Sequence, residues 1–308
     1  MTPIQDFHQL TWDSTLDDDL RQLTRLAVRE DLARQQDWTT VALVGPDAQG
    51  RAAMTAREPG VVAGLPALPV IIDEMQANID VELLLTDGDD LTTGAAVARF
   101  TGSARDLLTC ERPMLNLVNR LSGIATLTRE YVRRIAGTRA RIYDTRKTTP
   151  GWRRLEKYAV RCGGGHNHRT GLFDAILIKD NHLALAAEKN LTPADAVRRT
   201  RQFVAELDAQ YIAKEMLIEV EIDHLDQLDS VLAAGPDIVL LDNMSPAELH
   251  AAVQRRNEQA PHIELEASGG VALGTAHEIA QTGVDRISVG ALTHASRSLD
   301  LGLDWIPT

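Results

Sequence analysis

Basic side chains stand at the ends of two short apolar runs of the chain. Arg146 and Lys147 follow one run closely, and Lys179 directly follows the other. Arg169 lies between them, in a stretch that begins with three glycines. Guanidinium groups bind carboxylate and phosphate oxygens through two parallel hydrogen bonds. The four residues therefore indicate a site for a small anion.

Two acidic residues farther along the chain have the opposite chemistry. Glu221 lies near the end of one apolar run, and Asp242 ends the next. Carboxylates bind Mg²⁺ or stabilise a positive charge that develops during a reaction. Taken singly, Asp242, or Glu219 two residues before Glu221, is equally well explained by a pair with a surface lysine. Together with the basic residues, they favour a divalent cation carried by a polyphosphate.

Glycines at two later positions are suited to phosphate. Ser268-Gly269-Gly270 precedes a predicted helix, and Gly290 precedes another short segment. Backbone N–H groups in such loops can face a phosphate without a Cβ in the way. Glycine pairs also occur in plain turns, so this signal is weak by itself.

Histidines of the glycine-rich stretch offer a further polar group. His168 can orient or protonate an acid. For His166 and His182 we favour a structural role. The sequence contains no nucleophile motif of a Ser-His-acid triad, no Gly-x-Gly-x-x-Gly after a first strand and no P-loop, which disfavours a triad hydrolase, a dehydrogenase and a P-loop kinase.

An alternation of strands and helices must position these residues. From residue 140 onward, apolar β-branched runs alternate with amphipathic helical runs, which predicts parallel strands joined by crossover helices. The predicted strands are 141–143, 175–178, 217–222, 238–241, 263–267 and 286–289, and the predicted helices are 193–207, 225–233, 246–255 and 275–281. The polar residues then share the carboxyl edge of the sheet, where active sites of α/β proteins lie. An α/β barrel and an open doubly wound sheet both fit.

The first third of the chain has a different pattern. A helix is predicted near residues 16–32, antiparallel strands at 51–57, 79–85 and 95–100, and a long helix or a broken helical pair at 107–134.

Composition describes an ordinary globular protein. The 308 residues include 44% hydrophobic residues, and 32 basic against 44 acidic residues give a net charge of −12. Residues 112–179 carry 15 basic and 4 acidic residues, a local balance of +11 that leaves −23 for the remainder. This distribution suits a small polyanion and disfavours nucleic acid. Neither a membrane span nor a signal pattern is present, so we expect a cytoplasmic protein.

Several longer motifs carry a resemblance to a known family. They are Glu111-Arg112-Pro113-Met114-Leu115-Asn116, Asp144-Thr145-Arg146-Lys147-Thr148-Thr149-Pro150-Gly151, Arg161-Cys162-Gly163-Gly164-Gly165 with Asn167-His168-Arg169, Ile178-Lys179-Asp180-Asn181-His182, Glu219-Val220-Glu221, Leu241-Asp242-Asn243 and Ala267-Ser268-Gly269-Gly270. In this order they resemble the quinolinate phosphoribosyltransferases, the carboxylating nicotinate-nucleotide pyrophosphorylases.

The resemblance implies a two-part α/β fold. Residues 1–117, completed by residues 293–308, are expected to form an N-terminal open α/β sandwich, and residues 118–292 an incomplete, TIM-like α/β barrel. The family works as a homodimer in which one subunit's sandwich meets the other's barrel, and higher oligomers are compatible with the sequence. No nucleic acid or membrane partner is expected.

The implied activity is that of a pentosyltransferase in NAD biosynthesis. Quinolinate and 5-phosphoribosyl 1-diphosphate, with Mg²⁺, give nicotinate mononucleotide, diphosphate and CO₂. The implied catalytic residues are Lys147, Glu221 and Asp242, of which Glu221 and Asp242 also meet Mg²⁺ and the ribose hydroxyls. Arg112 of the neighbouring subunit, with Arg146, His168, Arg169 and Lys179, would hold quinolinate. Lys147 would bind the diphosphate, and the remaining substrate-binding positions are Thr145, Ser268, Gly269, Gly270, Ser288, Val289 and Gly290.

Two alternatives remain open at this stage. One is a relative with the same fold and another acceptor, such as nicotinate. The presence of Arg112, Arg146 and Arg169 together argues against it, because the second ring carboxylate needs these cations. The other is a sensor or scaffold without activity, against which Lys147, Glu221 and Asp242 argue.

Overall fold

The computed structural model describes residues 6–186, 191–207 and 216–306 of the chain. These residues form two compact units. The sandwich unit contains residues 10–129, 147–164 and 292–306, and the barrel unit contains the other described residues, namely 6–9, 130–146 and 165–291 with its gaps. The units differ from the two ranges expected from the sequence, because residues 118–129 and 147–164 belong with the sandwich.

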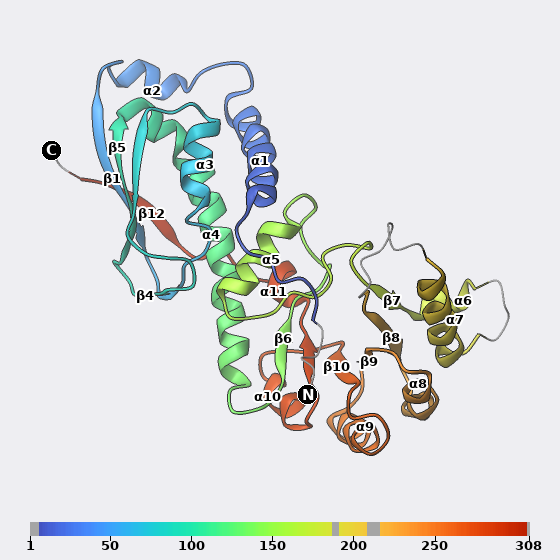
Figure 1. The fold of residues 1–308 in the computed structure, drawn as a ribbon. Coiled ribbons are helices and arrows are strands. Elements are labelled where there is room, and N and C mark those ends of the chain that lie inside the picture. The colour runs from blue at the N-terminus through green and yellow to red at the C-terminus, as the bar shows by residue number, and fades with distance from the viewer. Residues whose placement is uncertain (1–5, 187–190, 208–215, 307–308) are drawn as a thin grey trace. The chain divides into compact units, whose positions relative to one another are not determined.

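A four-stranded antiparallel sheet forms the base of the sandwich unit (Figure 1). Its strand order is β12-β1-β5-β3, with β1 (Gln49–Ala56), β3 (Ile79–Leu83), β5 (Ala96–Ser103) and β12 (Leu301–Trp305). Buried residues alternate with less buried ones along β1, as in a strand with one face against a core. The predicted antiparallel arrangement is confirmed, and a strand from the end of the chain completes the sheet. A separate pair joins β2 (Gly60–Val61) and β4 (Asp90–Leu91).

Helices complete the sandwich unit. They are α1 (Ser14–Leu32), α2 (Trp38–Leu43), α3 (Ala67–Glu74) and α5 (Arg153–Cys162). The carboxylate of Asp13 caps α1 by accepting the N–H groups of Thr15 and Leu16. The buried Leu16 and Leu20 give α1 the apolar stripe that the sequence predicts.

The long helix α4 (Ala104–Arg134) is unbroken over 31 residues although it contains Pro113. A proline inside a helix removes one N–H donor and costs about 3 kcal/mol or more. Cys110, Met114 and Leu117 are all buried, so packing on both sides of the proline offsets this cost. Of the two possibilities that the sequence allows, the structure therefore shows the single helix.

Six parallel strands form the sheet of the barrel unit. They are β6 (Arg141–Tyr143), β7 (Ile176–Ile178), β8 (Ile218–Ile222), β9 (Ile238–Asp242), β10 (Glu264–Ser268) and β11 (Arg286–Ser288). Helices α6 (Asp180–Ala184), α7 (Pro193–Glu206), α8 (Leu228–Ala234), α9 (Pro246–Gln259), α10 (Ala276–Gln281) and α11 (Ala291–His294) follow the strands, and a 3₁₀ turn, Leu225–Gln227, precedes α8.

Strand order decides between the two folds that the sequence allows. The order β6-β11-β10-β9-β8-β7 runs from β7 to β11 in chain order, and β6 lies beyond β11 (Figure 1). A doubly wound sheet reverses direction, whereas this one winds one way, as a barrel does. Among the described residues, β6 and β7 form the two edges of the sheet, so the barrel is incomplete, as the resemblance implied.

Register aligns the ends of the barrel strands. Ser268 pairs with Asp242 across β10 and β9, and Ala267 pairs with Ile287 across β10 and β11. The strand ends therefore lie at one level, which brings the polar residues that follow them to a common edge. Within the described residues, no helix is both long and apolar enough to span a membrane.

Candidate active site

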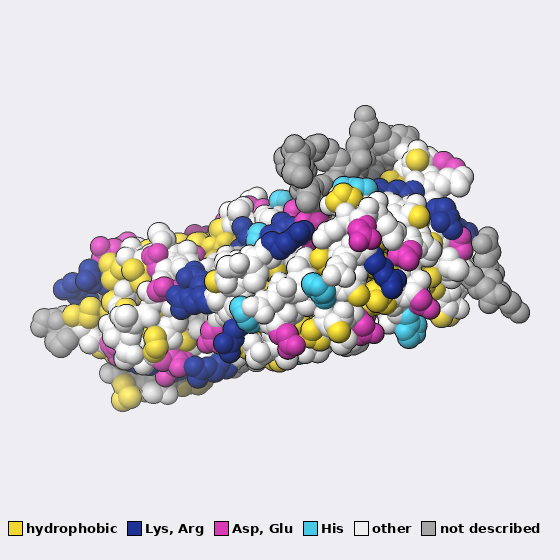
Figure 2. All heavy atoms as spheres, turned by 90° about the horizontal axis from the view of Figure 1, so that it is seen from below, with side chains coloured by type: hydrophobic (Ala, Val, Ile, Leu, Met, Phe, Trp, Pro, Cys, Tyr) yellow, Lys and Arg dark blue, Asp and Glu magenta, His cyan; other side chains and the backbone are white. Residues whose placement is uncertain are grey.

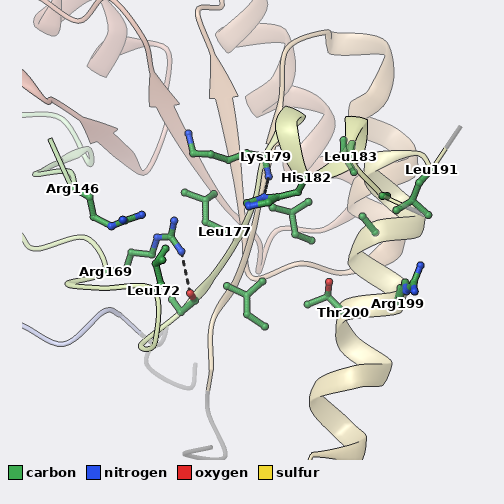
Figure 3. Close-up of a pocket in the computed structure, with 15 residues that line it drawn as sticks. Arg146, Arg169, Leu172, Leu177, Lys179, His182, Leu183, Leu191, Arg199 and Thr200 are labelled. Carbon is green, nitrogen blue, oxygen red and sulfur yellow. Dashed lines mark hydrogen bonds between the residues drawn. The ribbon is translucent and has the colours of Figure 1, made fainter. Parts of the chain in front are cut away.

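A cavity of about 610 Å³ lies beside β7 in the barrel unit (Figure 3). Arg146, Arg169, Lys179 and Arg199 contribute its positive charge, and apolar side chains such as Leu177 contribute most of the remaining lining. Four cations around an apolar surface suit a flat ring that carries negative groups. The structure thus brings together the three cations of this unit that the sequence assigns to the anion.

Arg169 is held from several sides. Arg169 is 6% exposed, and its Nη1 donates to the carbonyl of Ala175 at 3.3 Å (Figure 3). The carboxylate of Asp174 accepts the N–H groups of Thr170 and Gly171, which fixes the turn after Arg169. Burial, and next the like charge of Arg146, lower the pKa of the Arg169 guanidinium. A bound anion would relieve both effects, since it supplies the missing opposite charge.

Lys179 is paired with an acidic residue of the next strand. Its Nζ lies 2.8 Å from Oε2 of Glu221, whose side chain is 12% exposed. The pair forms because β7 and β8 are parallel neighbours and both residues stand at their carboxyl ends. The backbone N–H of Lys179 donates to Nδ1 of His182, so His182 caps α6, and it also lines the cavity.

Asp242 and the glycine loop meet at the ends of β9 and β10. The backbone N–H of Asn243 donates to the carbonyl of Ser268 at 2.9 Å, and Asn243 Nδ2 donates to Asp242 Oδ2 at 2.7 Å. Gly269 has φ of +88°, and a Cβ there would lie 2.2 Å from Asn243 Oδ1. Glycine is therefore required at position 269 for both conformation and space.

Residues 288–290 form the neighbouring strand end. Ser288 is the last residue of β11 and is buried, and the backbone N–H of Val289 donates to the carbonyl of Tyr143 at 2.9 Å. Since Ala267 pairs with Ile287, Ser268 and Ser288 come at matching positions. The two loops expected to hold a phosphate, the second of which ends at Gly290, are thus adjacent.

His168 lies deeper than the sequence suggested. Its residue is 6% exposed, and its ring stacks on Phe7 with the centroids 4.3 Å apart. Nδ1 accepts the backbone N–H of Arg169 at 2.8 Å, and Nε2 lies 2.9 Å from Oε2 of Glu219. His168 is also absent from the described lining of the cavity. Both ring nitrogens face protein groups, so the geometry differs from the expected direct contact with substrate.

Three buried acidic residues near the site received no role from the sequence, although Asp144 and Glu219 stand in the motifs given above. Asp144 accepts the backbone N–H of His168 at 2.9 Å, while Glu219 and Glu266 are buried in the strands beneath the site. A signal was present for the last two, because Glu219 precedes Glu221 by two residues and Glu266 precedes Ser268 by two. Residues two apart on a strand share a face.

The remaining predicted residues are divided between the two units. Thr145 is half-buried after β6. Arg112 and Lys147 belong to the sandwich unit. Arg112 has a side chain that is 68% exposed and lies 3.2 Å from Glu111, and the carbonyl of Lys147, an exposed residue, accepts the hydroxyl of Thr293 at 2.7 Å.

Much of the basic stretch 112–179 has structural partners. Arg120 pairs with Glu156, Arg141 with Glu264 and Arg154 with Asp19. Figure 2 shows basic and acidic side chains interspersed on one face. Our interpretation of the +11 balance as a substrate-binding feature was therefore too broad, since several of these cations stabilise the fold.

Comparison with known proteins decides the family. The description "Quinolinate phosphoribosyl transferase, N-terminal domain" matches residues 37–122, and "Quinolinate phosphoribosyl transferase, C-terminal domain" matches residues 124–304. The chain belongs to the quinolinate phosphoribosyltransferase family. The expected family membership is thus confirmed.

Relatives of this quinolinate phosphoribosyltransferase family member match most of its length. The nicotinate-nucleotide pyrophosphorylase [carboxylating] of Mycobacterium leprae is 46% identical over 289 residues, which cover 93% of this chain and 97% of the relative. A probable nicotinate-nucleotide pyrophosphorylase [carboxylating] of Synechocystis is 42% identical and covers 90% of this chain and 89% of its own. The solved structure of the nicotinate-nucleotide pyrophosphorylase from Francisella tularensis has a TM-score of 0.86 at 35% identity and covers 98% of this chain and 100% of its own.

Proposed function

We propose that this chain transfers the phosphoribosyl group of 5-phosphoribosyl 1-diphosphate to quinolinate, with decarboxylation, and so makes nicotinate mononucleotide, diphosphate and CO₂ for NAD biosynthesis. The cavity with Arg146, Arg169 and Lys179 carries the proposal, because its charge and apolar surface match a pyridine with two carboxylates. Family membership and relatives named for this activity support the same reaction.

Quinolinate binds in this cavity. The guanidinium groups of Arg146 and Arg169 take its carboxylates through paired hydrogen bonds, and Lys179 adds a third positive charge. Leu177 lies against the ring, which leaves the pyridine nitrogen turned toward the carboxyl ends of β8 and β9. Arg112 of a second copy of the chain adds a further cation, which makes the homodimer part of the proposal. The cytoplasmic location stays a prediction.

The phosphoribosyl donor binds over the neighbouring strand ends. Backbone N–H groups of residues 268–270 and 288–290 hold its 5-phosphate, and Lys147 holds its diphosphate. Glu221 and Asp242 fit a magnesium ion, because they place hard oxygen donors on adjacent parallel strands. Magnesium would stabilise negative charge on the departing diphosphate.

The reaction demands positioning more than covalent catalysis. When the bond between the ribosyl carbon and diphosphate breaks, positive charge develops on that carbon and on the ring oxygen, and Glu221 and Asp242 stabilise it. The pyridine nitrogen forms the new bond and becomes cationic. The adjacent carboxylate then leaves as CO₂, and the electron pair of the broken bond stays on the ring carbon beside the cationic nitrogen. A proton then adds to that carbon. The protein holds two mutually repelling anions in place for these steps.

Acceptor selectivity tests this proposal. Purified protein with the donor and Mg²⁺ should form nicotinate mononucleotide from quinolinate with a kcat/KM at least about 100-fold above that for nicotinate, because loss of one paired carboxylate costs about 3 kcal/mol or more. Equal use of both acceptors would show that the cavity does not recognise the second carboxylate. Absence of product from both acceptors would remove the enzyme assignment.

A further inference from the structure

A buried cluster beneath the cavity joins His168 to two acidic residues. Glu219 on β8 and Glu266 on β10 have no exposed surface, and their closest carboxylate oxygens lie 2.9 and 3.6 Å from His168 Nε2. Buried carboxylates are costly unless other groups compensate their charge. The cost of burying this cluster beneath the proposed substrate site suggests that the cluster has a function there.

The ring of His168 has a defined orientation. Nδ1 accepts the N–H of Arg169, so Nδ1 carries no proton. The proton of a neutral ring is then on Nε2, where it faces the carboxylates of Glu219 and Glu266. Stacking on Phe7 fixes the plane of the ring. The two acidic residues thus select one tautomer of His168.

This tautomer determines how the main chain is held at Arg169. The N–H of His168 donates to Asp144, and the N–H of Arg169 donates to the ring of His168 itself. Asn167 Nδ2 also donates to Asp144, at 2.6 Å. These hydrogen bonds fix the backbone at His168 and Arg169, and so the point from which the Arg169 side chain enters the cavity.

We propose that His168 is a positioning residue that acts on quinolinate through Arg169, and that Glu219 and Glu266 keep its ring in the tautomer that this requires. The inference rests on the proposed function, because it assigns Arg169 to the substrate. The buried cluster would then affect the affinity for quinolinate without contacting quinolinate itself.

A metal ion held by the same three side chains is the competing explanation. Their ligand atoms lie within 4.8 Å of one another, as in a metal site. A metal at Nε2 would place the ring proton on Nδ1, where it would oppose the N–H of Arg169. The observed hydrogen bond to Nδ1 therefore favours a proton at Nε2.

A matched pair of variants tests the positioning role. In His168→Asn the amide oxygen takes the place of Nδ1 and still accepts the Arg169 N–H, whereas in His168→Gln the amide reaches the place of Nε2 and leaves that N–H without its acceptor. We expect calorimetry to show a Kd for quinolinate within about threefold of wild type for the Asn variant and about 10- to 100-fold weaker for the Gln variant, since an unmade buried hydrogen bond is costly. The Kd for the phosphoribosyl donor should change less than about twofold in both.

Other outcomes would overturn the inference. Equal affinities of the two variants for quinolinate would remove the role of Nδ1, and a wild-type protein that fails to bind quinolinate would instead refute the proposed function. Should the Gln variant not fold, ¹⁵N NMR of histidine-labelled wild type decides, with the His168 signals assigned by their loss in the Asn variant. A neutral ring protonated at Nε2 supports the inference, whereas a proton on Nδ1 or one equivalent of bound metal contradicts it.

Discussion

Lys179 Nζ lies 2.8 Å from Glu221 Oε2, so the cation proposed to hold quinolinate is paired with the carboxylate proposed to face the ribosyl donor. In the proposed function, quinolinate must compete with Glu221 for Lys179, and the donor must compete with Lys179 for Glu221. When the donor engages Glu221, Lys179 becomes available to quinolinate. The pair therefore couples the two binding sites, and such coupling is reciprocal.

Glu221→Gln should uncouple the two substrates. We expect a saturating amount of an unreactive donor analogue, in which CH₂ replaces the oxygen between the ribosyl carbon and the diphosphate, to tighten quinolinate binding to wild type about 5- to 10-fold in the presence of Mg²⁺, as typical couplings do. In the variant, quinolinate alone should bind more tightly than to wild type, because Lys179 is released. Asp242→Asn is the matched control and should leave the Kd for quinolinate alone unchanged. Calorimetry measures each value, and unchanged or weaker binding to Glu221→Gln would disprove the competition.

Arg146→Ala should abolish most quinolinate turnover. Loss of one charged partner of a substrate carboxylate costs about 3 to 5 kcal/mol, or about two to three orders of magnitude in kcat/KM. Arg154→Ala is the control from the same basic stretch, because Arg154 pairs with Asp19 in the sandwich unit. Steady-state kinetics of both variants decide the matter, and nearly intact activity of Arg146→Ala would show that the dicarboxylate lies elsewhere.

Gly269→Ala should weaken donor binding. The added Cβ would collide with Asn243, and the positive φ of residue 269 disfavours alanine, so the loop must shift away from the 5-phosphate. We expect a Kd for the donor more than about 10-fold weaker. Gly274→Ala serves as control, since it adds a Cβ in open space nearby. If both variants bind the donor equally well, the loop does not hold the phosphate.

Protein stability should fall as the pH rises from about 4.5 to about 7 because of Glu266. Burial, and next the charge of Glu219, raise the pKa of Glu266 from 4.5 to about 7. The unfolded chain releases this proton near pH 4.5 and the folded protein only near pH 7, so the stabilisation is complete below pH 4.5 and is lost as the pH rises to about 7. It amounts to roughly 3 kcal/mol.

The variant Glu266→Gln should remove this part of the pH dependence. Denaturant unfolding at pH 5 and pH 8 should show that the difference in free energy of unfolding between these pH values is smaller in the variant than in wild type. Glu248→Gln, an exposed position in α9, is the control. A variant that loses as much stability as wild type over this range would assign the effect to other groups.

The edge of the site could be predicted from the sequence because parallel strands end at one side of a sheet. Lys179, Glu221, Asp242 and Ser268 each stand at or near the end of an apolar run, and the structure places them at the carboxyl ends of four successive strands. Pattern alone left the choice between barrel and doubly wound sheet open, because it fixes the direction of strands and not their order.

The layer beneath the site escaped prediction for a different reason. The alternation of side chains along β8 shows which face of the strand carries Glu219. It does not show that His168, from a loop distant in sequence, lies against Glu219. Likewise, no helix was predicted at residues 180–184, which form α6, where His182 accepts the N–H of Lys179. Contacts of this kind depend on tertiary structure, which periodicity does not encode.

Position-specific labelling of quinolinate tests the central claim most directly. Protein is incubated with donor, Mg²⁺ and quinolinate labelled either in the carboxylate next to the ring nitrogen or in the other one. We expect donor-dependent release of the first label as CO₂, in amounts equal to the diphosphate formed, while the second label stays in the mononucleotide. Release of neither label, or of the second one, would contradict it.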